Sequence, residues 1–178
     1  MKRRFTDSAE VPIIAWDFDG TINVGGEDTY PICGKPRKYA KEVMNILHVI
    51  GVKNVMWTSR DIAYNQDDGE IHDHVTPMIK FLNANDIKYH AINKSVQFAP
   101  YPYNGRKIYA HMYIDDRAFG WRDHDFVMLE VFMNICIDIL GVGGIKAVEI
   151  IDEFKANDGK LKEDTLHELR KYVEHWKD

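Results

Sequence analysis

The chain has 178 residues, of which 45% are hydrophobic and 29% are charged, and its formal net charge at pH 7 is −5. This length suits one compact domain with a hydrophobic core. The acidic balance argues against broad electrostatic binding to nucleic acid, and no apolar run approaches the roughly 20 residues that cross a bilayer, so we expect no membrane partner.

The first part of the chain alternates short apolar runs with helical patterns. A β-branched apolar run over residues 11–16 predicts a buried strand, and a glycine-rich loop follows it. Apolar residues at helical spacing predict a helix over 39–50, which Gly51 ends. A second strand is predicted over 52–57.

The alternation continues along the chain. We predict a helix over 71–83, a third strand over 87–92 and, after a loop rich in proline and tyrosine, a fourth strand over 109–114. Strands that alternate with helices indicate right-handed crossovers and a parallel sheet. The predicted fold class is therefore α/β, with a doubly wound, Rossmann-like parallel sheet.

The last third of the chain is helical in pattern. Helices are predicted over 125–140, 145–154 and 163–176. A glycine-rich break follows residue 140, so we divide the chain into a core over 1–140 and a helical C-terminal extension over 141–178. The extension could lean over the site or build a homo-oligomer.

Polar side chains follow three of the four predicted strands. They are Asp17 and Asp19 after the first strand, Thr58, Ser59 and Arg60 after the second, and Asp115 and Asp116 after the fourth. Ligands of open α/β sheets bind beyond the carboxyl ends of the strands. Four carboxylates in one crevice would repel one another without a cation, and Mg²⁺ prefers carboxylate and phosphate oxygens. The pattern therefore predicts a metal and phosphate site.

These residues resemble three signatures of the haloacid dehalogenase superfamily of phosphohydrolases. The first signature, Asp-x-Asp-x-Thr, matches Asp17-Phe18-Asp19-Gly20-Thr21, and the acid pair of the fourth matches Asp115-Asp116. The second signature, a Ser or Thr after strand two, fits Thr58 or Ser59, and we prefer Thr58 because it is the first residue beyond the apolar run. Together the signatures cover roughly residues 11–120 in the expected order.

The resemblance implies a mechanism. Asp17 would attack phosphorus and form an aspartyl-phosphate, while Asp19 would protonate the leaving oxygen and later activate water. Thr58 would hydrogen-bond the transferring phosphoryl group. Mg²⁺ would lie between Asp17, Asp19 through its carbonyl, and one or both of Asp115 and Asp116.

The lysine of the third signature has two candidates. Lys107 lies eight residues before Asp115, so it would be about 25 Å away, at the wrong edge of the sheet, if that segment is mostly strand. Lys94 directly follows the third strand and starts at the correct edge. We choose Lys94 as the catalytic lysine.

Other polar and aromatic residues complete the predicted site. We assign substrate binding to Gly20, Thr21, Ser59 and Arg60. Arg60 could contact a phosphate or pair with an acid. The aromatic residues Tyr101, Tyr103, Phe119 and Trp121 could form a rim for a base or sugar, or pack as ordinary loop residues.

Loop lengths predict a site without a cap domain. About 17 residues separate Thr21 from the helix that begins near Tyr39, enough for a flap that Gly25 and Gly26 would allow to move. Between the second and third signatures, a helix and a strand use most of the chain. We therefore expect the small, capless type of the superfamily.

The expected function is a Mg²⁺-dependent phosphatase that acts on a phosphorylated small molecule or on a phosphate exposed on a larger substrate. The Asp-Asp-Arg sequence at 115–117 also resembles the phosphatase half of polynucleotide kinase-phosphatases, so nucleotides or nucleic-acid ends are the leading specific alternative. A phosphotransferase would share every residue named. A non-catalytic binding or regulatory protein on the same fold is the alternative of another class.

The two cysteines, Cys33 and Cys136, lie far apart without the spacing of a metal site. Paired cysteines are typical of secreted proteins, whereas isolated ones are typical of reducing compartments. We therefore expect two reduced thiols and a cytoplasmic protein.

Overall fold

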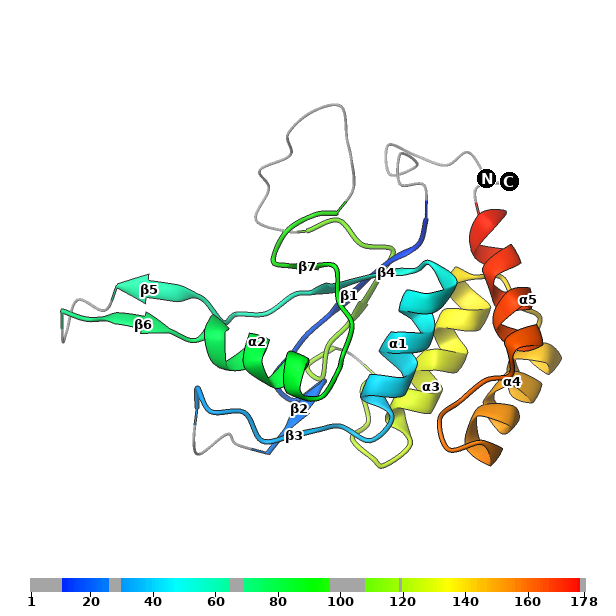
Figure 1. The fold of residues 1–178 in the computed structure, drawn as a ribbon, viewed down its shortest axis with the longest axis horizontal. Coiled ribbons are helices and arrows are strands. Elements are labelled where there is room, and N and C mark those ends of the chain that lie inside the picture. The colour runs from blue at the N-terminus through cyan, green and yellow to red at the C-terminus, as the bar shows by residue number, and fades with distance from the viewer. Residues whose placement is uncertain (1–10, 26–29, 65–68, 97–107, 119, 177–178) are drawn as a thin grey trace.

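A four-stranded parallel sheet forms the centre of the protein (Figure 1). The computed structural model describes residues 11–25, 30–64, 69–96, 108–118 and 120–176. The strands, in their order across the sheet, are β7 (Ala91–Ile92), β4 (Lys53–Met56), β1 (Ile13–Trp16) and β8 (Met112–Ile114). The parallel α/β class is confirmed, and all four predicted strands are present, although each is shorter than predicted and β7 covers only Ala91–Ile92 of the predicted 87–92.

The order of the strands reverses next to β1. The chain runs outward from β1 to β4 and β7, and then returns to place β8 on the other side of β1. The carboxyl ends of β1 and β8 are therefore the topological switch point, where open α/β sheets bind ligands.

The predicted helices form with small changes at their ends. They are α1 (Ala40–Ile50), α2 (Val75–Ala84), α3 (Val127–Asn134) with the π-helical continuation η2 (Ile135–Ile139), α4 (Gly144–Ala156) and α5 (Glu163–Glu174). Helix α1 buries the predicted stripe, including Val43, Met44 and Leu47, against the sheet. Gly51 then ends the helix with a φ of 100°, a left-handed conformation that glycine adopts without strain.

Different residues pack against the two faces of the sheet. Ile14 and Trp16 point into the main hydrophobic cluster, to which all five α-helices contribute. Ile13, Ala15 and Val55 lie on the opposite face in a smaller cluster with Ile108. A doubly wound arrangement needs helices on both faces, and within the described ranges the helices belong to one face, so the second helical layer is not confirmed.

The C-terminal helices share the main core. Phe154 of α4 packs against Phe132 of α3 and Tyr39, with ring centroids 5.7 and 5.6 Å apart, and Leu169 and Val173 of α5 are buried in the same cluster. Figure 1 shows α1, α3, α4 and α5 side by side. Helices α4 and α5 therefore belong to the main core, and the boundary after residue 140 stays a prediction.

Two short antiparallel ribbons extend from the carboxyl edge of the sheet. The first, β2 (Asn23–Val24) with β3 (Lys35–Pro36), lies where a flap was predicted. The second, β5 (Ile62–Tyr64) with β6 (Ile71–Asp73), projects from the body (Figure 1). This hairpin occupies the stretch of chain between Arg60 and α2.

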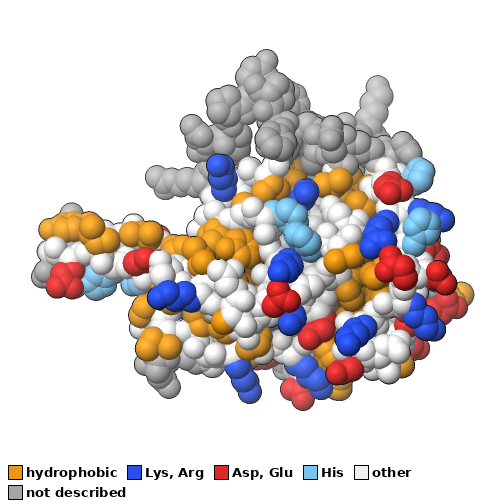
Figure 2. All heavy atoms as spheres, in the orientation of Figure 1, with side chains coloured by type: hydrophobic (Ala, Val, Ile, Leu, Met, Phe, Trp, Pro, Cys, Tyr) orange, Lys and Arg blue, Asp and Glu red, His pale blue; other side chains and the backbone are white. Residues whose placement is uncertain are grey.

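The hairpin corrects the predicted start of α2. The sequence pattern assigned Ile71 to that helix, but Ile71 pairs with Tyr64 across the ribbon. Asp73 then accepts hydrogen bonds from the amides of Val75 and Thr76 at 3.0 and 2.8 Å, which stabilises a helix that begins at residue 75. The apolar side chains on the hairpin are exposed to solvent (Figure 2).

Both cysteines, Cys33 and Cys136, are free thiols, as predicted. Among the described residues, no helix combines the length and apolar character that crossing a membrane requires.

Candidate functional site

Hydrogen bonding beyond the strand ends holds the backbone at Asp17. Trp16 pairs with Met56 on one side and Ile114 on the other. The Asp17 amide donates to the Ile114 carbonyl at 2.8 Å, and the Trp57 amide donates to the Trp16 carbonyl at 2.7 Å. Because this register continues past the strands, Asp17 lies level with the residue that follows Ile114, at the switch point.

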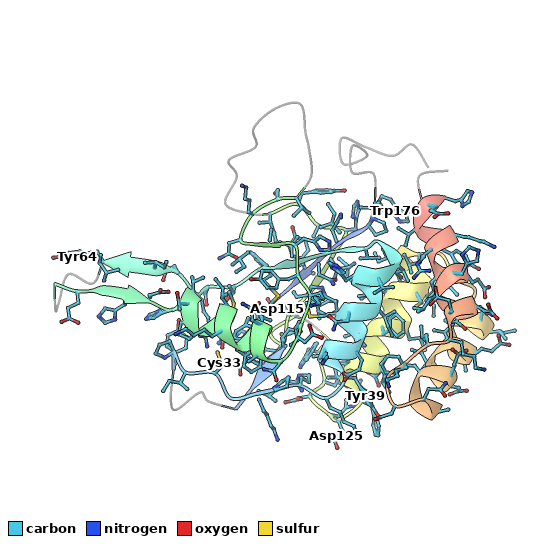
Figure 3. All side chains as sticks on the ribbon, in the orientation of Figure 1. Cys33, Tyr39, Tyr64, Asp115, Asp125 and Trp176 are labelled. Atoms are coloured by element: carbon cyan, nitrogen blue, oxygen red, sulfur yellow. The ribbon has the colours of Figure 1, made fainter. Side chains whose placement is uncertain are left out.

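Three carboxylates converge at this point. One oxygen each from Asp17, Asp115 and Asp116 can be chosen so that all three lie within 4.8 Å of one another. Oxygen ligands of octahedral Mg²⁺ lie roughly 3 to 4 Å apart, given metal–oxygen distances of about 2.1 Å, so a small closure would bring the three into ligand positions. Figure 3 shows Asp115 near the centre of the view, between the hairpin and the helical layer.

The donor set fits Mg²⁺. All three groups offer hard oxygens, which this ion prefers. The Oδ1 atom of Asp116 is buried and has no hydrogen-bond partner within the described structure, so it is an acceptor that a cation would satisfy. Three of the four predicted metal ligands, Asp17, Asp115 and Asp116, are therefore together.

The cluster is electrostatically strained without a cation. Burial raises the pKa of Asp17 from its ordinary value of 3.8 to about 7, and the charges of Asp115, Asp116 and Asp19 act in the same direction. Burial, followed by the charge of Asp115, also raises the pKa of Asp116. Such shifts are expected where carboxylates are partly buried and lie close to one another.

Asp19, the fourth predicted metal ligand, was expected to bind through its backbone carbonyl, and that expectation stays a prediction. Its carboxylate has a different environment from the other three. Its carboxylate forms a two-pronged ion pair with Arg60, in which Nε donates to Oδ2 and Nη2 donates to Oδ1, both at 2.7 Å. Asn23 donates to Oδ1 as well, at 3.1 Å. Both carboxylate oxygens are thus engaged, and the side chain of Asp19 is not part of the three-carboxylate cluster.

Arg60 is enclosed on all sides. Its side chain is 1% exposed, and its guanidinium lies 4.9 Å from the ring centroids of both Phe18 and Tyr30. Nη1 donates to the carbonyls of Pro31 at 2.7 Å and His74 at 3.3 Å. Of the two roles considered from the sequence, pairing with an acid is the one that the described geometry shows, and Arg60 also ties the loop after β1 to the start of α2.

Thr58 is held in place while its hydroxyl keeps a proton to donate. Its amide donates to Oδ1 of Asn93 at 2.9 Å, and its carbonyl accepts from Nδ2 of Asn93 at 2.7 Å. Its hydroxyl oxygen accepts from the Arg60 amide at 3.1 Å, and among the described residues no acceptor takes the O–H itself. Ser59, the neighbouring candidate, is exposed.

Gly20 and Thr21 contact the carboxylate cluster directly. Gly20 has a φ of 84°, and a Cβ there would overlap Oδ2 of Asp116, so only glycine fits. The Thr21 hydroxyl accepts from the Asp116 amide at 2.9 Å and lies 3.5 Å from Oδ2 of Asp17. Both residues were predicted to bind substrate, and in the structure they support the cluster.

Lys94 lies two residues after β7, adjacent to the Asn93 that fixes Thr58. Its side chain is exposed, and no other described residue pairs with it. Lys107, the competing candidate, lies outside the described residues, as do Tyr101, Tyr103 and Phe119 of the predicted aromatic rim. The choice of Lys94 stays a prediction.

A pocket of about 240 Å³ opens beside the cluster. Its lining residues are Gly20, Val24, Gly25, Arg37, Asp116, Trp121 and Asp123. For Trp121 the sequence left two alternatives open, an aromatic rim or ordinary loop packing, whereas Arg37 was missed. The residues around Arg37 in the sequence do not mark it as part of a site, because its hydrogen-bond partners are distant in the sequence.

Comparison with known proteins supports the fold. No protein-family model and no curated protein matches the chain. A solved structure described as a conserved protein from Bacteroides thetaiotaomicron is similar, with a TM-score of 0.55 and 24% identity over 70% of this chain and 89% of that one. A target from Vibrio cholerae has a TM-score of 0.37 and 18% identity over 90% of this chain and 97% of that one, which is too distant to support an argument. The similarity to the first structure is one of fold alone.

Proposed function

We propose that this protein is a Mg²⁺-dependent phosphatase of the haloacid dehalogenase type, which hydrolyses a phosphomonoester through an aspartyl-phosphate. The observation that carries the proposal is the convergence of Asp17, Asp115 and Asp116 at the switch point of a parallel sheet. Mg²⁺ bound by these three side chains would neutralise the phosphate and the charge that develops in the transition state.

Asp17 is the proposed nucleophile. A carboxylate oxygen of Asp17 attacks phosphorus, the bond from phosphorus to the ester oxygen breaks, and the alcohol leaves. Water then attacks the phosphorus of the aspartyl-phosphate, which releases inorganic phosphate and restores the Asp17 carboxylate. The free hydroxyl proton of Thr58 can donate to a phosphoryl oxygen, and Lys94 remains the proposed cation of the third signature.

Asp19 is the proposed proton donor to the leaving oxygen and the base that later activates water. In the structure Arg60 engages both of its oxygens, so one of these hydrogen bonds must open and the carboxylate must take up a proton from water before it can donate one to the leaving oxygen. Asp19 is the more exposed partner of the pair, with a side chain 37% exposed, so it is the partner that substrate can reach.

The test is phosphate release from a panel of phosphomonoesters, with Mg²⁺ and with chelator. The panel contains sugar phosphates, nucleotides, phosphopeptides and 3′-phosphorylated oligonucleotides, so that the best substrate identifies the substrate class. Asp17→Asn should reduce turnover by at least about 10³-fold because the amide is not a nucleophile. Asp125→Asn, an exposed acid outside the cluster, is the matched control and should leave turnover unchanged.

Release that needs Mg²⁺ and disappears in Asp17→Asn would support the proposal. Release that persists in Asp17→Asn would rule out Asp17 as the nucleophile. Mg²⁺ binding without release from any ester would favour a phosphotransferase or a binding protein.

A further inference from the structure

Arg37 is a buried cation next to the carboxylate cluster that takes no part in the proposed chemistry. It is 8% exposed, and all three of its side-chain nitrogens have partners. Nε donates to the Thr21 carbonyl at 2.8 Å, Nη2 donates to the Gly20 carbonyl, and Nη1 donates to Asp123. Its guanidinium also lies 5.4 Å from the ring centroid of Trp121.

The partners of Arg37 come from both sides of the switch point. Gly20 and Thr21 belong to the loop after β1, which carries Asp17, whereas Asp123 belongs to the segment after β8, which carries Asp115 and Asp116. One guanidinium therefore links the two loops that supply the three carboxylates.

The loop residues that Arg37 holds are those that contact the cluster. The Thr21 hydroxyl accepts from the Asp116 amide, and the absence of a Cβ at Gly20 leaves room for the Asp116 carboxylate. A shift of the two carbonyls bound by Arg37 would move both contacts. We infer that Arg37 is a positioning residue, which clamps the loops after β1 and β8 so that their carboxylates are pre-organised to bind Mg²⁺.

This inference rests on the metal-binding part of the proposed function, but it needs no assumption about the substrate. A lysine should not replace Arg37, because its ammonium is a point charge and cannot reproduce a planar fork with bonds in three directions. If only the positive charge mattered, Arg37→Lys would keep its Mg²⁺ affinity. If the three hydrogen bonds of the guanidinium matter, Arg37→Lys should lose affinity.

The experiment is calorimetric titration of Mg²⁺ at pH 7.5 into the full chain and its variants. We expect Arg37→Ala and Arg37→Lys to bind Mg²⁺ at least tenfold more weakly. Asp123→Asn, which loses one arm of the clamp, should bind about threefold more weakly. Arg122→Ala is the matched control, because Arg122 is exposed and next to Asp123, and its affinity should be unchanged.

Hydrogen exchange of the metal-free protein gives a second readout. The amides of Gly20, Ile22 and Asn23 are hydrogen-bonded within the turn after β1. In Arg37→Lys they should exchange at least tenfold faster, while the amides of β4 should be unchanged. A general loss of stability would instead accelerate exchange in β4 as well.

Each outcome decides between the alternatives. Mg²⁺ affinity in Arg37→Lys within twofold of the wild type would overturn the clamp, as would accelerated exchange that extends to β4. A wild-type protein that does not bind Mg²⁺ would contradict the proposed function, and the clamp would then be judged by exchange alone. Unchanged exchange of the Gly20, Ile22 and Asn23 amides in Arg37→Lys would overturn the clamp.

Discussion

Asp17 and Asp19 are separated by one residue and have opposite surroundings. Asp17 faces two other carboxylates, and its raised pKa, about 7, reflects burial and the negative charges of these neighbours. Asp19 faces Arg60, which pairs with both of its oxygens. The Asp19 carboxylate is neutralised by a side chain of the fold, whereas no cationic side chain of the described residues pairs with Asp17.

The two surroundings imply different roles for Asp19 and Asp17. A carboxylate paired within the fold can react only after one of its hydrogen bonds opens, whereas an uncompensated carboxylate costs stability and retains affinity for a ligand. The charge left unpaired at the switch point is therefore the stronger sign of function.

The largest expected effect comes from removing the cation of the pair. Arg60→Met keeps most of the buried volume but leaves Asp19 unpaired, and it should lower the free energy of unfolding by about 3 kcal/mol. We place it at the low end for buried pairs because Asp19 is partly exposed and water can hydrate it. Urea denaturation measures the change, with the exposed Arg122→Met as control. A loss below about 0.5 kcal/mol would show that Arg60 is not a structural cation.

The second prediction concerns pH and the metal-free protein. The pKa of Asp17 is about 7 in the folded state against 3.8 for the free side chain, so its contribution to stability is lost as pH rises from about 4 to about 7. Asp17→Asn removes this loss. At pH 7.5 the variant should be more stable than the wild type by about 2 kcal/mol, which allows for partial screening by solvent, and at pH 4.5 the two should be nearly equal.

His90 gives the stability of both proteins a pH dependence of the opposite sign, which must be separated from that of Asp17 when unfolding is measured at the two pH values. Burial lowers the pKa of His90 to about 4 from 6.5, so its contribution to stability is lost as pH falls from about 6.5 to about 4, in both proteins. Because this contribution is the same in both proteins, it cancels when the free energy of unfolding of the wild type is subtracted from that of Asp17→Asn. Equal stabilities at pH 7.5 in chelator would show that the cluster is not strained.

The smallest effect tests the fit of Asp116 against Gly20. Gly20→Ala places a methyl group where Oδ2 of Asp116 lies, so Mg²⁺ affinity should fall about tenfold, or about 1.4 kcal/mol. Gly25→Ala is the matched control, because Gly25 also has a positive φ, 72°, but no atom of the described residues lies within 4 Å of an added Cβ. Both variants carry similar backbone strain, and only the first should lose affinity. Equal affinities would show that the Asp116 carboxylate does not need its observed position.

The sequence predicted those parts of the fold and site that depend on local pattern. Buried strands appear as apolar runs, and the carboxyl ends of parallel strands meet at one edge of the sheet, so the sequence alone places Asp17 close to Asp115. Thr58 followed from the same reasoning. The flap was predicted from the length of the loop alone.

The parts that were missed depend on distant contacts. Strands of three residues, such as β5 and β6, are too short to show a periodic pattern, so Ile71 was assigned to a helix. The partners of Arg37 and Arg60 lie 16 to 86 and 14 to 41 residues away, and no local rule selects them. The distribution of helices between the two faces of the sheet is likewise a property of the whole chain.

The most direct test of the central claim is anomalous diffraction from crystals grown with Mn²⁺, a cation that shares the preference of Mg²⁺ for carboxylate oxygens. The account predicts an anomalous peak between the carboxylates of Asp17, Asp115 and Asp116, with the Asp19 carboxylate still paired with Arg60. At saturating Mn²⁺, an empty cluster, or an ion held by Asp19 in place of Arg60, would contradict it.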